Sequence, residues 1–233
     1  MSELVHFTEH DTHGLLAMDD GKANALGFDM FEGLNAGLDK VEATGKVALI
    51  TGRPGKFSAG FDLSVMGKGD ESTLKLLREG ADLARRLMTF RAPVVLAVSG
   101  HALAMGALLC LSADYRIGTL GDYKIGLNET AIGMTLPWFG VELARERLAT
   151  THLGHAVNLG KIYDAPGAIE AGFLDDAVNE DALLSVATGA AQALSGLHLP
   201  SHGNVKQRVR GDFLARYEDA LRRDFESGEI MPS

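Results

Sequence analysis

Glu129 is the residue whose setting most suggests chemistry. It lies in the stretch KIGLNETAIGMTLPWFG, residues 124–140, which surrounds one acid with apolar residues and glycines and contains no histidine or serine. Partial removal from water raises the pKa of a carboxylic acid, because the charged form loses hydration, and a raised pKa suits proton transfer near neutral pH. The NET segment is equally typical of a turn, where the acid would be exposed or would cap a helix. The residues alone leave both interpretations open.

A first loop of small residues, GRPGKFSAGFDLSVM (residues 52–66), follows a predicted strand. Ala59 and Gly60 are adjacent in it, and small side chains allow a ligand to approach the backbone and to accept hydrogen bonds from its N–H groups. The alternative is a loop that needs unusual dihedral angles, with Asp62 as the cap of the next helix.

A second loop of this kind is SGHALAMGALL, residues 99–109. We expect a strand to end at Val98 and a helix to begin near Ala104, with Gly106 in its first turn. The first N–H groups of a helix have no partner within it and carry partial positive charge. Ligands of open α/β sheets bind beyond the carboxyl ends of the strands, so the two loops could each offer one N–H to an oxyanion. Close packing of the helix on the sheet would explain Gly106 equally well.

The elements that would position these loops alternate in type. Short apolar runs at residues 15–18, 47–51 and 94–98 predict strands, and residues 114–118 predict another. Apolar residues at helical spacing predict helices over residues 31–41 and 74–88. The alternation favours an α/β fold with parallel strands and right-handed crossovers.

From residue 141 onward the pattern predicts helices only, over residues 141–160, 166–172, 180–195 and 204–226. No linker or internal repeat divides the chain. One α/β core with a helical C-terminal region is the simplest organisation.

Composition limits the partners and the compartment. The formal net charge of −9 over 233 residues argues against a nucleic-acid partner, because phosphate binding needs a basic face. The single cysteine, Cys110, excludes an intrachain disulfide and fits a reducing compartment. No apolar run reaches the ~18 residues of a membrane span, and the first residues lack the pattern of a signal or transit peptide. We therefore expect a cytoplasmic protein with no membrane partner.

Four segments, in order along the chain, resemble motifs of the crotonase (enoyl-CoA hydratase/isomerase) superfamily. MDDGKANAL (residues 18–26) resembles N-R-P-x-x-x-N-A-L, and FSAGFDLSVM (57–66) resembles F-[CS]-A-G-x-D-L. AVSGHALAMGALLCLSADYRIG (97–118) resembles A-x-x-G-x-[AC]-x-G-G-G-x-x-L-x-x-x-C-D-x-R-[IV]-[AG], and IGLNETAIGM (125–134) resembles [FI]-G-x-[PN]-E-x-x-[LI]-G. The likeness extends from about residue 4 to residue 195, and four ordered motifs are far more specific than any one of them.

The resemblance implies a crotonase-type ββα spiral core over residues 1–195 and a C-terminal helical segment, residues 196–233, that packs on a neighbour in a homotrimer or hexamer. It also implies acyl-CoA thioester substrates, whose enolate-like oxygen is held by two backbone N–H groups. By position these donors are Ala59 and Met105. Met105 stands where the family usually has glycine, so its side chain must point elsewhere. Coenzyme A is part of the substrate, and neither a separate cofactor nor a metal is implied.

Two positions bear on the type of reaction. Typical hydratases of the family use two glutamates, and the corresponding places here hold Leu108 and Glu129. One carboxylate is enough to move a proton between C2 and C4 of an enoyl thioester, and IGLNET resembles the segment of Δ3,Δ2-enoyl-CoA isomerases. Isomerisation by Glu129 is therefore the favoured function. A 2-enoyl-CoA hydratase with a single glutamate and a non-catalytic acyl-CoA-binding protein are the alternatives.

Other motif positions are predicted to bind the substrate. They are Lys22, Ala23, Asn24, Ala25 and Leu26 in the first motif, Lys56, Phe57, Ser58, Gly60, Phe61, Asp62 and Leu63 in the second, His101, Ala104, Gly106 and Leu108 in the third, and Trp138 beyond the fourth. His101 is equally explained as a satisfied or exposed histidine, Trp138 as a core aromatic, and the two lysines as surface charges.

Overall fold

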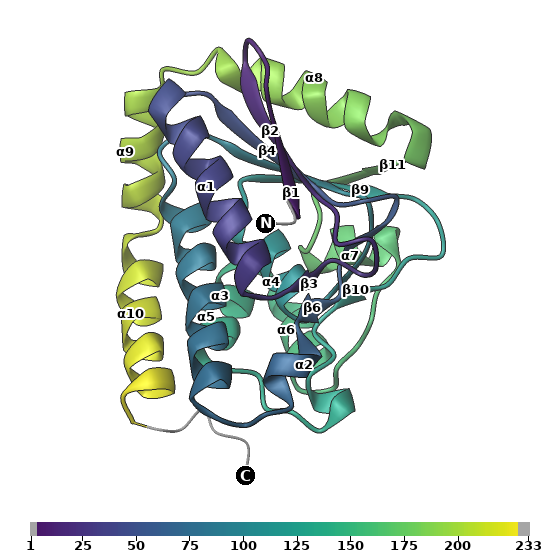
Figure 1. The fold of residues 1–233 in the computed structure, drawn as a ribbon, viewed down its shortest axis with the longest axis vertical. Helices are drawn as coiled ribbons and strands as arrows, with labels where there is room; N and C mark the ends of the chain where they lie inside the picture. The colour runs from purple at the N-terminus through teal and green to yellow at the C-terminus, as the bar shows by residue number, and fades with distance from the viewer. Residues whose placement is uncertain (1–3, 228–233) are drawn as a thin grey trace.

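A six-stranded sheet forms the centre of the computed structural model, which describes residues 4–227 (Figure 1). Its strands, in spatial order, are β1 (Val5–Glu9), β2 (His13–Met18), β4 (Val47–Thr51), β7 (Val94–Val98), β9 (Tyr115–Thr119) and β11 (Asp176–Val178). β1 and β2 pair antiparallel, and every later neighbour pairs parallel, as the alternating sequence pattern predicted.

The central strands are apolar throughout because helices cover both faces of the sheet. In β7, Leu96 belongs to the main core, whereas Val95 belongs to a second cluster beneath α8 (Leu183–Ser195), which lies across that face (Figure 1). Successive side chains of a strand point to opposite faces, so a strand between two helical layers needs an apolar residue at each position.

Three helices contribute to the main core on the other face. α1 (Phe28–Thr44) and α3 (Glu71–Thr89) pack side by side, and α4 (Met105–Ser112) packs against α3. α3 begins at Asp70, whose carboxylate accepts a hydrogen bond from the Ser72 N–H at 2.9 Å, as an N-cap residue should. Every residue of α4 is buried, which explains why its sequence has no polar face.

Two small sheets hold the predicted loops. They consist of β5 (Gly55–Ser58), β8 (Gly100–Leu103) and β10 (Ile125–Gly126), and of β3 (Ala25–Leu26) with β6 (Gly60–Phe61). The strand ends at Val98 and the helix begins after Ala104, as predicted, but between them the chain forms β8, which was not predicted. Parallel pairing of β5 and β10 with β8 brings the three motif segments together.

The C-terminal half departs from the predicted boundaries. Its helices are α5 (Trp138–Arg147), α6 (Thr150–Val157), α7 (Ala165–Ala171), α8, α9 (Leu199–Val209) and α10 (Gly211–Phe225), with the short α2 (Leu63–Met66) earlier in the chain. The helix predicted over 141–160 is two helices, the one over 204–226 is divided at Arg210, and β11 was not predicted. Turn breaks of one or two residues inside continuous helical patterns are difficult to recognise from sequence.

The last two helices, α9 and α10, pack on the core of their own chain, and their predicted packing on a neighbour stays a prediction. Phe213, Tyr217 and Leu221 belong to the main hydrophobic core, and the Tyr217 hydroxyl donates to the Ala81 carbonyl of α3 at 2.9 Å. Residues on both sides of the predicted division at residue 195 therefore contribute to the main core. Residues 1–3 and 228–233 of the two predicted segments lie outside the described residues.

No single helix between residues 4 and 227 is long and apolar enough to span a membrane. By length and composition alone, one bent pair passes the same test, Glu180–Ser195 with Leu199–Val209, at an angle of 100°.

Candidate active site

A largely apolar cavity of about 680 Å³ opens beside the two predicted loops. Its lining comes from α2, α3, α4, the segment after β10, α5 and the end of α10. The lining residues are Ala59, Phe61, Leu63, Met66, Thr73, Leu74, Leu77, Ala104, Leu108, Asn128, Glu129, Ile132, Met134, Thr135, Leu136, Pro137, Trp138, Phe139, Val141 and Asp224. A long apolar chain would find few polar groups to desolvate here.

Glu129 brings the titratable group to this cavity. It precedes a single 3-10 turn, and its carbonyl accepts hydrogen bonds from the N–H groups of Ile132 at 3.1 Å and Met134 at 2.9 Å. Its side chain is 8% exposed, and its Oε2 has no partner among the described residues. Burial raises the pKa of Glu129 to about 7, because the carboxylate is removed from water without a compensating cation. A buried acid with this pKa can both accept and donate a proton near neutral pH.

Leu108 lies on α4 and lines the same cavity with 1% of its surface exposed. The position at which typical hydratases of the family have a glutamate is therefore part of the cavity wall, and in this chain it holds an apolar side chain. A carboxylate at this position would face the cavity that also contains Glu129.

Asp224 also lines the cavity, and its carboxylate caps the start of α5. Its two oxygens accept hydrogen bonds from the backbone N–H groups of Trp138 and Phe139, each at 2.9 Å. These are the first N–H groups of α5, which have no partner within the helix. The Arg223 guanidinium lies 3.3 Å from the centroid of the Trp138 ring, so the end of α10 closes this side of the cavity.

The structure contradicts the prediction that Ala59 is an oxyanion donor. The Ala59 N–H already donates to the Ala23 carbonyl at 3.0 Å, and a ligand could use it only by breaking that bond. Ala59 lines the cavity but its amide is part of the loop's own framework.

Phe61 offers the better-placed amide. The next N–H, of Asp62, donates to the Leu26 carbonyl of β3 at 3.1 Å. Successive amides along a strand point in opposite directions, so the Phe61 N–H points away from β3. Sequence reasoning placed Phe61 among the substrate-binding residues but missed this role. The sequence alone could not have identified Phe61 as the donor, because the direction of each N–H group depends on how β3 and β6 pair.

Gly60 brings the first loop against the start of α4. Its φ is +96°, and a Cβ at Gly60 would lie 2.8 Å from the Ala104 Cβ and 3.3 Å from the Met105 nitrogen. No other residue fits this conformation and this approach without strain. The amides of Phe61 and Met105 are therefore neighbours in space.

Met105 is the first residue of α4, and among residues 4–227 its N–H has no hydrogen-bond partner. It follows Ala104, whose φ of 50° is unusual for a residue with a side chain. The Met105 side chain is fully buried in the core, which agrees with the expectation that it points away from the site.

Several predicted substrate-binding residues hold the loops instead. Asn24 is fully buried, and its amide donates to the carbonyls of Met18, Lys56 and Phe57. The Ser58 hydroxyl donates to the Asn24 carbonyl at 2.8 Å and accepts from the Gly60 N–H at 3.1 Å. This network fixes the relative positions of the first and second motifs.

The remaining predicted residues fall into three groups. Phe57 and Leu26 are fully buried core residues, and Asp62 caps α2 by accepting from the Ser64 N–H at 2.8 Å. Leu63, Ala104 and Trp138 line the cavity, whereas Lys22, Ala23, Ala25, Lys56 and Gly106 do not. Gly106 has the packing role considered for it, because a Cβ there would lie 2.6 Å from the Ser58 carbonyl oxygen.

His101 lies outside the cavity lining. Its Nδ1 accepts from the Lys124 N–H at 2.9 Å, and its ring packs edge-on against Tyr123. Burial, followed by the charges of Lys56 and Lys124, lowers the pKa of His101, so it is a neutral, satisfied histidine near pH 7.

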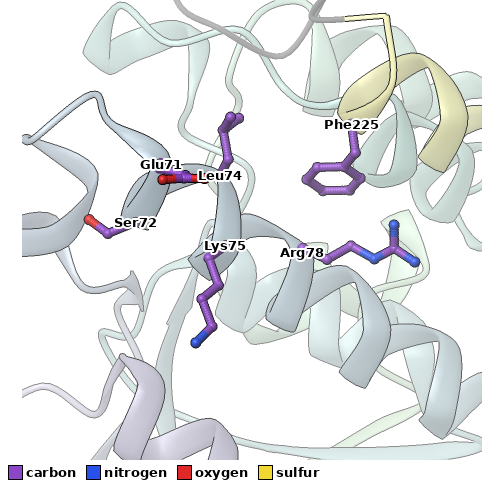
Figure 2. A pocket seen from close by; sticks show the side chains of 6 residues that line it. All are labelled: Glu71, Ser72, Leu74, Lys75, Arg78 and Phe225. Carbon is purple, nitrogen blue, oxygen red and sulfur yellow. The ribbon is translucent and has the colours of Figure 1, made fainter.

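A second, shallower cavity of about 520 Å³ lies between the start of α3 and the end of α10 (Figure 2). Leu74 lines both cavities, whereas none of the predicted site residues lines this one. Arg78 extends beneath the Phe225 ring and Lys75 points away from it (Figure 2).

The fold and the cavity define an α/β protein with a largely apolar cavity, two adjacent backbone donors and, in Glu129, a buried carboxylate with one oxygen that has no partner among the described residues. Residues 12–226 match the model of the enoyl-CoA hydratase/isomerase family. The chain belongs to this family, and the predicted crotonase fold is confirmed.

Similar proteins agree with this assignment. An enoyl-CoA hydratase/isomerase family protein from Pseudomonas syringae is 38% identical, with a TM-score of 0.95 over 98% of this chain and 99% of that one. A protein from Mycobacterium tuberculosis, called an enoyl-CoA isomerase in one solved structure and a probable enoyl-CoA hydratase in another, is 36% identical; the first of these structures has a TM-score of 0.92 over 97% of this chain and 99% of that one. The mitochondrial enoyl-CoA delta isomerase 1 of Mus musculus is 28% identical over 88% of this chain and 73% of its own length.

Proposed function

We propose that this enzyme is a Δ3,Δ2-enoyl-CoA isomerase in which Glu129 is the single acid–base. The observation that carries the proposal is the buried carboxylate of Glu129 in the cavity wall. Its Oε2 has no partner among the described residues, both oxygens of Asp224 accept from backbone N–H groups, and Leu108 stands in place of a further acid. The isomerase name of the Mus musculus relative, at 28% identity, supports it, whereas the Mycobacterium tuberculosis relative is described under both names.

The reaction moves one proton. Unprotonated Glu129 removes a proton from C2 of a 3-enoyl thioester, and the electron pair shifts toward the thioester carbonyl. The N–H groups of Phe61 and Met105 then donate to the developing oxyanion, where preorganised donors are most effective. Protonated Glu129 returns the proton to C4 as the double bond moves to C2–C3. No water is consumed, so a second carboxylate to hold water has no task.

The raised pKa of Glu129, about 7, suits both halves of this cycle. A carboxylate of ordinary pKa would be a poor proton donor in the second half, and a much higher pKa would leave little base for the first.

The experiment that tests the proposal follows two substrates. With 3-hexenoyl-CoA we expect conversion to the 2-enoyl isomer at unchanged mass, detected by the absorbance of the conjugated thioester. With crotonyl-CoA we expect little gain of water by product mass. Rapid hydration of crotonyl-CoA without isomerisation of 3-hexenoyl-CoA would contradict the proposal, and tight binding without turnover of either would indicate an acyl-CoA-binding protein.

A 2-enoyl-CoA hydratase is the second candidate. Asn128 Oδ1 and Glu129 Oε2 are buried acceptors without partners among the described residues, and both residues line the cavity. A water molecule that donated to both would satisfy them and would stand beside the acid–base. Asn128 would then replace the second glutamate of typical hydratases.

The oligomeric state is also proposed from the family, as a homotrimer or a hexamer. Val205 and Val209 of α9 are 56% and 73% exposed, which leaves apolar surface for a second copy to cover. Static light scattering at micromolar concentration should give a mass of three or six chains, and a monomer would contradict this.

A further inference from the structure

Gly80 lies in the interior of α3, where glycine is less favourable than alanine. Glycine is needed here because the surrounding side chains leave no room for a Cβ atom. A Cβ at Gly80 would lie 2.6 Å from both Cε1 and Cζ of the Phe61 ring and 3.3 Å from the Met105 sulfur. The side chains of the two residues with the proposed oxyanion donors therefore meet on the same glycine.

The two side chains have different surroundings. The Phe61 ring lines the cavity and also packs against the fully buried Phe31, with ring centroids 6.2 Å apart and an angle of 60° between the planes. Met105 is itself fully buried. In close-packed interiors a displaced group shifts its neighbours. A methyl group at position 80 would thus displace the Phe61 ring, the Met105 side chain or both, and would disturb the two residues whose amides are the proposed donors.

We propose that Gly80 is a positioning residue of the oxyanion hole, because its missing side chain sets the separation between the Phe61 and Met105 amides. The inference rests on the proposed function, in which these two amides hold the thioester oxygen. Gly80 touches neither donor amide nor substrate and acts through the two side chains. Donors aimed at a developing charge lose effect when they move by about 1 Å, so a small shift is sufficient to slow the reaction.

The variant Gly80→Ala tests this with a matched control. We expect kcat for 3-hexenoyl-CoA isomerisation to fall about tenfold to a hundredfold, with KM changed less than threefold, because the oxyanion forms only in the reaction. Gly189→Ala is the control, since Gly189 is also inside a helix and nothing lies within 4 Å of its Cβ position. It should retain wild-type kcat and KM.

A spectroscopic readout reports on the oxyanion hole without turnover. Acetoacetyl-CoA forms an enolate whose near-ultraviolet absorbance differs from that of the keto form, and aligned donors favour the enolate. We expect the bound enolate signal to decrease in Gly80→Ala, while the affinity for coenzyme A itself stays within twofold. A merely structural role for Gly80 would leave this balance unchanged.

If the Phe61 ring is what a methyl group at position 80 displaces, a shorter side chain at position 61 should reduce the loss of activity caused by Gly80→Ala. In a Phe61→Leu background, which keeps the backbone N–H and shortens the side chain, Gly80→Ala should cost less than a third of what it costs in the wild type, in kcat and in enolate signal. This pair also covers the case in which Gly80→Ala alone does not fold. An unchanged kcat and enolate signal in Gly80→Ala, a rise in KM alone, or an equal loss in both backgrounds would each overturn the proposal.

Failure of this inference is distinguishable from failure of the proposed function. A wild-type enzyme that isomerises 3-hexenoyl-CoA, with an unaffected Gly80→Ala variant, overturns the role of Gly80 alone. A wild-type protein without isomerase activity overturns the proposed function, and the enolate signal then still tests the position of the donors.

Discussion

Glu129 is the residue on which the proposed chemistry depends, because it combines burial, an unpartnered oxygen and a position in the cavity wall. Glu129→Gln keeps its shape but removes the proton acceptor. We expect a loss of isomerase rate on the order of 10²–10⁴. Acyl-CoA affinity should change little, since the donors are backbone groups. Wild-type-like turnover of 3-hexenoyl-CoA by Glu129→Gln would rule out the mechanism.

The pKa of Glu129 also predicts a pH dependence of stability. Its folded-state pKa of about 7 lies above the unfolded value of 4.5, so the folded protein binds more protons between these pH values. Wild-type stability should therefore decline as pH rises through this window, by about 3 kcal/mol from this group. Glu129→Gln lacks the ionisation, so it should gain stability relative to wild type from pH 4.5 to pH 8 in urea unfolding. A constant difference between the two proteins would show that Glu129 ionises as an exposed acid does.

Leu108 decides whether the cavity can be changed to add water. Leu108→Glu places a second carboxylate at a position that lines the cavity with Glu129. If the cavity holds the water that two glutamates can orient, hydration of crotonyl-CoA should increase by at least tenfold, measured by product mass. Leu108→Gln is the control, because it has similar size without a charge. A variant that unfolds at lower urea concentration without a gain in hydration would show that position 108 serves packing alone.

At the scale of elements, α10 holds the start of α5 through Asp224. Pro137, at the N-cap position of α5, supplies no side-chain cap, and Asp224 accepts from the first two N–H groups instead. Asp224→Ala should lower the free energy of unfolding by about 1–3 kcal/mol, because two buried donors lose their acceptor. Asp219→Ala is the control on the same helix, since Asp219 is exposed and, among residues 4–227, its one ion pair is with the exposed Arg222. Equal costs for the two variants would contradict the capping role.

Local patterns in the sequence predicted the elements but not every contact between them. The apolar runs of β4 and β7 and the stripe of α3 predicted those elements because each is buried in a way that fixes its periodicity. The donor role was assigned to Ala59 instead of Phe61, since that choice depends on which amide β3 leaves free. Asp224 could not be found from sequence, because it meets α5 across 86 residues of chain.

At the scale of the whole molecule, Asp114 ties the C-terminal helices to the core. Its carboxylate accepts from the Val94 N–H at 2.9 Å, from Lys206 Nζ at 2.6 Å and from Arg210 at 2.9 Å. Lys206 and Arg210 are each 6% exposed and also donate to the carbonyls at the end of α3. These contacts attach residues 196–227 to the core of their own chain. The amphipathic pattern of these residues predicts a buried face but does not say which chain covers it.

Asp114→Asn should therefore destabilise the whole chain. The amide keeps the shape but leaves two buried cations without their anion, and removal of one partner from a buried ion pair costs about 3–5 kcal/mol. Burial already lowers the pKa of Lys206 to about 8 against the opposing charge of Asp114. The charge of Asp114 raises the pKa of Lys206, so the lysine of the variant loses its proton at a lower pH than that of the wild type. The folded variant therefore gains more stability than the folded wild type as pH rises, and the cost should be smaller at pH 9 than at pH 7. Urea unfolding at both pH values measures it.

The control for this prediction is Glu9→Gln, which removes the partner of Lys46 from a pair that is 24% and 51% exposed. Exposed pairs contribute little, so its cost should stay below about 0.5 kcal/mol at both pH values. Asp114→Asn with a cost equal to that of Glu9→Gln would show that α9 and α10 are held by their apolar faces alone. A cost of several kcal/mol that diminishes at pH 9 would place the attachment of the C-terminal helices in this buried ion cluster, because apolar packing does not change over this pH range.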